Sequence, residues 1–174
     1  MAGSHNAGVE VASPDLFRGA PYALVTNGLG EDHTAVRAIE ETVRSIGAKP
    51  IFVDAEEHDR AVARTSQAPQ LVSTALALAV FGTGDDEVFD LAGGGLKDMT
   101  RLAESRWSVW EDVCRTNSDE IAAALDESIA EMEAARKAIS SGDFGGLRDI
   151  FHAANELVTR FHARRGEGAS STTR

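Results

Sequence analysis

The first third of the chain alternates short β-prone runs with one amphipathic helical segment. Residues 22–26 and 51–53 are short apolar, β-prone runs, and an Asn-Gly turn follows the first of them. Between them, residues 32–46 carry an apolar stripe at helical spacing, formed by Val36, Ile39, Val43 and Ile46. Gly47 follows as a C-terminal stop for this helix. The pattern predicts a small βαβ unit.

From Glu56 onward the apolar spacing is helical almost without interruption. The expected helices cover residues 61–81, a short segment before Leu91, a segment beginning near Leu96, residues 107–141 with a kink or break at Asn117 and Ser118, and residues 144–162. Residues 73–79 are apolar nearly all round, which is typical of a helix enclosed by other helices. The predicted fold is therefore mainly α, a helical bundle with a small N-terminal α/β element.

The domain organisation follows from the same pattern. We expect an α/β element over residues 1–54, a helical domain over 55–164, and a disordered Gly, Ser and Thr tail over 165–174. The helices carry wider apolar faces than one domain of this size needs to bury. Self-association would cover the surplus, which predicts a homodimer.

Composition and charge narrow the class of protein. The chain is 43% hydrophobic and 26% charged, as in an ordinary globular domain. Its longest apolar stretch, residues 71–81, is too short to span a bilayer, and no signal-peptide pattern opens the chain. We therefore expect a cytoplasmic protein with no membrane partner. The net charge of −11 argues against a nucleic-acid partner, because phosphate backbones require a basic face.

Metal and nucleotide sites are not predicted. His5, His33, His152 and His162 show no metal-ligand spacing among themselves. The single Cys114 falls inside a helical pattern, where a buried, inert thiol is the common case. No Gly-x-Gly-x-x-Gly stands between a strand and a helix, so we expect neither a dinucleotide nor another cofactor on these residues.

The most informative segment is Gly93-Gly94-Gly95-Leu96-Lys97-Asp98-Met99-Thr100-Arg101. Glycines before a helix allow close backbone approach, and two cations four residues apart project from one helix face. Such a face can bind an anion. The alternative is a solvated surface in which Lys97 and Arg101 pair with Asp98 and Glu104.

This segment, followed by Trp110, is similar to the signature of the prephenate and arogenate dehydrogenase family. Further pieces agree in order: Met1 to His5 and residues 16–21 resemble the family's exit from its nucleotide-binding domain, and residues 57–59 resemble its passage into the helical domain. The likeness covers residues 1–163. It implies a two-domain dimer in which a Rossmann domain holds NAD or NADP and a helical C-terminal domain forms the dimer and closes the substrate pocket.

Carried over by position, the resemblance implies roles for individual residues. Lys97 and Arg101 would bind substrate carboxylates, Trp110 would line the pocket and Ser4 would lie near its mouth. For Trp110 a plain core position remains equally open.

The departures concern the histidines. The family's catalytic histidine stands just before the point at which this chain begins, so we expect that general base to be absent. Where the family shows Ser-His-x-Pro-His, this chain reads Ser66-Gln67-Ala68-Pro69-Gln70. Gln67 can still form hydrogen bonds to a substrate but does not titrate near neutral pH. His58 beside Asp59 could act as a base, although a polar role at a helix start is commoner.

Three functions remain open. The first is a stand-alone, non-redox enzyme, such as an isomerase, cyclase, lyase or decarboxylase, acting on a small carboxylated ring or amino-acid-like substrate. The second is a non-catalytic dimerisation or ligand-binding protein. The third is the substrate and dimer half of a split prephenate dehydrogenase, with a separate Rossmann-domain protein as its partner.

Overall fold

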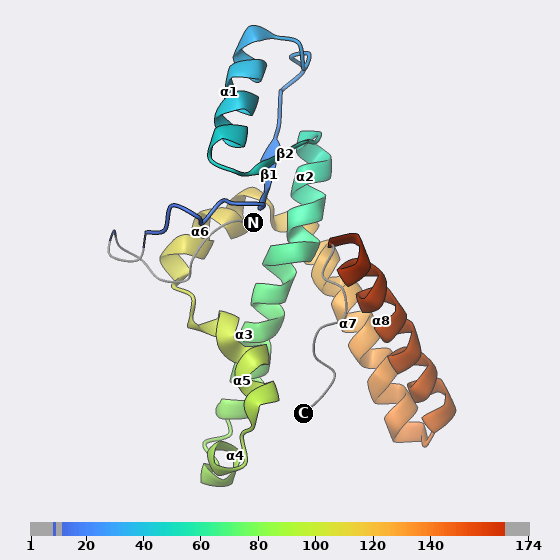
Figure 1. The fold of residues 1–174 in the computed structure, drawn as a ribbon. Coiled ribbons are helices and arrows are strands. Elements are labelled where there is room, and N and C mark those ends of the chain that lie inside the picture. Colours follow the sequence, from blue (N-terminus) through green and yellow to red (C-terminus); the bar gives the residue numbers. More distant parts are fainter. Residues whose placement is uncertain (1–8, 10–11, 166–174) are drawn as a thin grey trace. The chain divides into compact units, whose positions relative to one another are not determined.

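The computed structural model describes residue 9 and residues 12–165, and the chain forms two compact units, one reaching to Leu125 and one beginning at Asp126 (Figure 1). The elements in chain order are β1 (Pro21–Leu24), α1 (Thr34–Ser45), β2 (Lys49–Phe52), α2 (Ala55–Val62), the π-helical turn η2 (Ala63–Gln67), α3 (Ala68–Phe81), α4 (Asp86–Asp90), α5 (Gly94–Thr100), the 3-10 turn η3 (Arg101–Glu104), α6 (Trp107–Thr116), α7 (Ser118–Ser141) and α8 (Phe144–Arg165). The prediction of a mainly helical fold with a small α/β element is confirmed.

The N-terminal βαβ unit has its own small core. β1 and β2 pair in parallel, with Leu24 opposite Phe52, and α1 connects them. Leu24, Val43 and Ala48 form the buried cluster. Of the predicted apolar stripe on α1, Val36 and Val43 are buried but Ile39 and Ile46 are exposed. A sheet of two short strands is too narrow to cover a whole helix face.

Helices α2 and α3 form one continuous rod through the π-helical turn (Figure 1). Asp54 begins the rod, because its side chain accepts a hydrogen bond from the amide of Glu56. Within the turn, the amide of Ala68 bonds the carbonyl oxygen of Ala63, five residues back. Pro69 follows directly and has no N–H to donate, so the helical hydrogen-bond pattern is interrupted at this point. The helix predicted from residue 61 therefore begins six residues earlier, at Ala55.

The main helical core joins this rod to the start of α7. Its buried members are Ala63, Ala68, Ile121 and Ala124, and Leu71 and Leu125 pack against them. Three of the four buried side chains are alanines, so the helices can approach closely. The predicted break at Asn117 is confirmed, because α6 ends at Thr116 and α7 begins at Ser118.

Helix α3 is not enclosed in the described part of the chain, which corrects the expectation from its apolar sequence. Its buried residues are Ala68, Gln70 and Ser73, whereas Leu78 is 71% exposed. Neighbouring elements cover one face of α3, and the buried face is the one that carries polar side chains. The larger apolar side chains of α3 are half-buried at Leu71, Val72, Leu76, Val80 and Phe81 and exposed at Leu78.

The second unit contains the end of α7 and all of α8. Gly142, with φ +71°, ends α7, and the side chain of Asp143 accepts a hydrogen bond from the amide of Gly146 at the start of α8. The chain reverses at this turn (Figure 1). None of the described helices is long and apolar enough to cross a membrane.

Candidate functional site

A line of buried polar residues runs along one face of the η2–α3 rod. Gln67, Gln70 and Ser73 are spaced three residues apart and are 9%, 5% and 3% exposed. We call these three residues the polar seam. Residues at this spacing share a helix face, so the seam faces the segments that pack on it.

Two members of the seam hold the segment that carries the predicted cations. The side-chain nitrogen Nε2 of Gln70 donates to the main-chain oxygen of Leu102 at 2.7 Å. The hydroxyl of Ser73 donates to the main-chain oxygen of Met99 at 2.8 Å. The hydroxyl of Ser105 donates to Oε1 of Gln70 at 3.2 Å. The seam is thus bonded to α5, to η3 and to the residue directly after η3.

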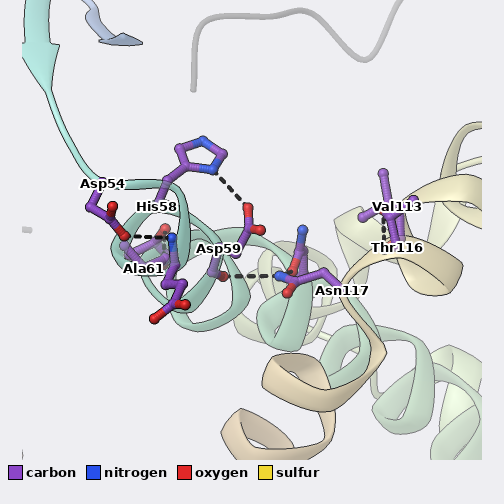
Figure 2. Close-up of polar contacts among 10 residues, drawn as sticks. Asp54, His58, Asp59, Ala61, Val113, Thr116 and Asn117 are labelled. Atoms are coloured by element: carbon purple, nitrogen blue, oxygen red, sulfur yellow. Dashed lines mark hydrogen bonds and ion pairs between the residues drawn. The ribbon is translucent and has the colours of Figure 1, made fainter. Parts of the chain in front are cut away.

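The third member, Gln67, is bonded to the junction of α6 and α7. Nδ2 of Asn117 donates to the main-chain oxygen of Asp59 at 2.9 Å (Figure 2). The same nitrogen donates to Oε1 of Gln67 at 2.8 Å. A main-chain carbonyl only accepts, so the bond to Asp59 fixes which way the Asn117 amide points. It follows that Gln67 presents its oxygen to Asn117 and its NH2 group elsewhere.

The NH2 group of Gln67 has no protein partner in the described residues. No fully buried side-chain nitrogen or oxygen of the described chain lacks a hydrogen-bond partner. This nitrogen is therefore within reach of solvent, and it remains a donor for a ligand. Since glutamine does not titrate, the donor is present at every pH.

Lys97 lies in α5, and Arg101 opens the 3-10 turn that follows it. Both side chains are exposed, and neither forms an ion pair with Asp98, Glu104 or any other described residue. The self-paired surface considered from the sequence is therefore absent from this structure. At Gly93, Gly94 and Gly95 an added Cβ would meet no atom within 4 Å, so packing within the described chain does not require these glycines.

The other predicted site residues lie on separate elements. Trp110 is half-buried in α6 and has no hydrogen bond or ring contact with Lys97 or Arg101 within the part of the chain that the structure covers. His58 and Asp59 lie on α2, with Nδ1 of His58 2.9 Å from Oδ1 of Asp59 (Figure 2). Ser4 lies outside the described residues.

A polar cleft of about 270 Å³ lies beside Asn117. Its lining residues are Glu56, Asp59, Arg60, Thr116, Asn117, Ser118, Asp119 and Glu120. Four of these eight are carboxylates and one is a cation, which lies 3.7 Å from the carboxylate of Glu120. The electrostatic potential of this cleft disfavours an anion. Neither Lys97 nor Arg101 lines it, so the cleft is distinct from the predicted anion site.

Sequence reasoning missed three residues that organise this region: Ser73, Ser105 and Asn117. Asn117 was predicted only as a helix break, and Gln70 only as a replaced histidine. One signal was available. Polar residues recur every third position, at Gln67, Gln70 and Ser73, in an otherwise apolar helix, and a helix of this kind presents such a line to a polar partner.

Comparison with known proteins places the chain in a family. The sequence model described as "Prephenate dehydrogenase, dimerization domain" matches residues 54–153. The prephenate dehydrogenase of Bacillus subtilis is 33% identical over 161 residues, which cover 90% of this chain and 42% of that protein. The probable prephenate dehydrogenase NovF of Streptomyces niveus is 30% identical over 92% of this chain and 44% of its own length. The chain thus spans less than half the length of these two relatives.

A solved structure agrees with this assignment at the level of the fold. The prephenate dehydrogenase from A. aeolicus, in complex with hydroxyphenyl propionate and NAD+, matches with a TM-score of 0.83 and 22% identity over 92% of this chain and 57% of that one. With the family match covering residues 54–153 and the B. subtilis enzyme 33% identical, the chain belongs to the prephenate dehydrogenase family and contains its dimerization domain.

Proposed function

We propose that this chain binds a small carboxylated ring compound or a similar amino-acid-like anion through Lys97 and Arg101. The observation that carries the proposal is that both cations are exposed and form no ion pair with the described residues, in a chain with a net charge of −11. An arginine guanidinium binds a carboxylate through two parallel hydrogen bonds, and the lysine adds a point charge. Gln67 would donate to a ligand oxygen, and Trp110 and Ser4 would complete the pocket.

The chemistry proposed for these residues alone is a non-redox step, such as isomerisation, cyclisation, elimination or decarboxylation. The hydride transfer of a nicotinamide-dependent dehydrogenase needs a bound dinucleotide, and the 174 residues contain no dinucleotide fingerprint. The His58–Asp59 pair is the candidate base, because the carboxylate orients the imidazole through Nδ1. The similarity to a prephenate dehydrogenase and to NovF supports a cytoplasmic role in aromatic amino-acid or specialised metabolism.

Arg101→Ala tests the anion site. Titration calorimetry with prephenate, arogenate and hydroxyphenyl propionate should show binding of at least one by the unaltered chain. The substitution should weaken that binding at least about tenfold, because a hydrogen bond to a charged group contributes about 1.5–3 kcal/mol. The matched control is Arg44→Ala, which removes an exposed arginine paired with Glu40 in α1 and should leave binding unchanged. Absence of binding to all three compounds, or equal affinities in the two variants, contradicts the proposal.

We further propose that the family's dimerization domain assembles this chain as a homodimer. The unit that begins at Asp126, which includes α8, exposes large apolar side chains: Ile129, Met132, Ile139, Phe144, Phe151, Leu157, Val158 and Phe161. One α7–α8 hairpin is too thin to bury them, and a second copy would cover them in pairs.

Light scattering should therefore give twice the chain mass of 18.5 kDa. Phe151→Glu should raise the dimer dissociation constant at least about tenfold, because it places a charge on an apolar surface in both copies. His152→Glu, at the next position of the same exposed helix, is the control. A monomeric mass for the unaltered chain contradicts the dimer.

A second candidate function is the substrate and dimer half of a dehydrogenase whose nucleotide-binding domain is supplied separately. It is favoured by the coverage of 42% of the B. subtilis protein. Copurification from the source organism with a Rossmann-domain protein, and NAD-dependent oxidation of prephenate only by the mixture, would distinguish this function from the non-redox one.

A further inference from the structure

We propose that Gln70 and Ser73 are positioning residues, which hold the segment carrying Lys97 and Arg101 in the geometry that binds the anion. The inference rests on the proposed anion site, and it names the side chains of the fold that hold this site in its binding geometry. The juxtaposition that carries it is the pair of bonds from the seam to the main-chain oxygens of Met99 and Leu102. In the sequence, Met99 lies between Lys97 and Arg101, and Leu102 directly follows Arg101.

The segment has little else to hold it in place. α5 spans seven residues and η3 four, lengths at which a helix is unstable without tertiary support. No residue of α5 or η3 is buried, and Met99 is 57% exposed. Leu96, Leu102 and Ala103 are only half-buried, so hydrophobic burial docks this segment on α3 incompletely, and the buried polar bonds add to it.

The geometry of the two bonds makes them specific. Gln70 and Ser73 are 5% and 3% exposed, so an oxygen or nitrogen left without its partner there would be costly. Nε2 of Gln70 must donate to the Leu102 carbonyl, and its Oε1 accepts from the Ser105 hydroxyl, so both ends of the amide are used. The Gln70 side chain thereby bonds η3 at Leu102 and the residue directly after η3 at Ser105. Together with the Ser73 bond at Met99, the Leu102 bond brackets Arg101 along the chain.

The affinity for the anion depends on the fraction of molecules in which this segment is docked on α3. If the segment leaves its docked position part of the time, the apparent dissociation constant rises by the inverse of the docked fraction. Losing both seam bonds, each with a net stabilisation of about 1 kcal/mol, should lower the docking equilibrium constant about 30-fold. For a segment that is docked about three quarters of the time in the unaltered chain, the docked fraction then falls to roughly one tenth. The affinity for a carboxylate probe should then fall about tenfold, although neither altered residue needs to touch the probe.

The test compares three variants of the full chain with the unaltered chain. The first is the double variant that combines Gln70→Met with Ser73→Ala, and the other two are the single substitutions Ser73→Thr and Thr74→Ala. Ser73→Thr, with Gln70 unchanged, keeps a hydroxyl donor at this position and should retain the unaltered exchange and affinity. Thr74→Ala is the matched control, because the Thr74 hydroxyl bonds the carbonyl of Gln70 within its own helix and not the cation segment. Two quantities are measured: hydrogen exchange of the amides of residues 94–104, and the calorimetric affinity for hydroxyphenyl propionate or for whichever of the three compounds the unaltered chain binds best.

Support requires faster exchange confined to residues 94–104 and about tenfold weaker binding in the double variant, with neither change in Thr74→Ala. Unchanged exchange in this segment overturns the positioning role. Faster exchange with unchanged affinity overturns it too, while leaving the anion site intact if Arg101→Ala still weakens binding at least about tenfold. If the unaltered chain binds none of the compounds, the proposed function fails and the positioning role fails with it.

Discussion

Ile121→Ala should lower the free energy of unfolding of the chain by about 3 kcal/mol, because it removes the largest side chain of the main helical core. Ile121 is 5% exposed and packs among alanines. Its buried neighbours, Ala63, Ala68 and Ala124, are too short to refill the volume, so a cavity should remain at the junction of α7 with the η2–α3 rod. Urea unfolding followed by circular dichroism would measure the change.

The matched control is Ile39→Ala in α1. The chemical change is identical, but Ile39 is 55% exposed, so the expected loss is below about 1 kcal/mol. Equal losses in the two variants would contradict the placement of the core. The comparison also tests the sequence interpretation, because helical spacing alone assigned Ile39 to the buried stripe of its helix.

Asn117→Asp should lower the free energy of unfolding by about 2 kcal/mol at neutral pH. The substitution replaces the NH2 group, which donates to Asp59 and to Gln67, with a second acceptor oxygen. Gln67 can rotate its amide to donate instead, but the main-chain oxygen of Asp59 has no such option. The four carboxylates at the cleft, Glu56, Asp59, Asp119 and Glu120, add like-charge repulsion.

Ser118→Asp is the control that distinguishes the loss of the Asn117 hydrogen-bond donor from the effect of an added negative charge. Ser118 lines the same cleft at the next position, so this variant adds an equal charge without removing the bridge. It should lower the free energy of unfolding by less than about 0.5 kcal/mol, since a surface charge next to a helix N-terminus is partly favourable. Losses of equal size in the two variants would mean that the Asn117 bridge contributes nothing to stability.

Asn117 also connects stability to the site. Its bonds fix the Gln67 amide so that the NH2 group is the end left available. In the Asn117→Asp variant the amide should rotate and turn its oxygen outward, where it would repel a carboxylate. The same substitution should therefore weaken anion binding, a change that Ser118→Asp should produce only through its charge.

Local pattern was sufficient for much of the fold. Helical spacing predicted α7 and α8, and the alternation of short strands with one helix predicted the parallel pairing of β1 and β2. Gly47 was predicted as the stop of α1 and has φ +80° there. These features depend on residues close in sequence, whose preferences act before any tertiary contact forms. The motif around Lys97 and Arg101 likewise placed the chain in its family.

Only the tertiary structure decided which face of α3 is buried and what the cations contact. An apolar sequence predicted enclosure on all sides, but the neighbours of α3 cover the face with the polar seam, because the carbonyls of Met99 and Leu102 need donors once they are packed there. The Lys97 and Arg101 side chains could have paired with Asp98 and Glu104, and the fold leaves them unpaired. Such outcomes depend on partners 26 to 50 positions away, which helical periodicity does not encode.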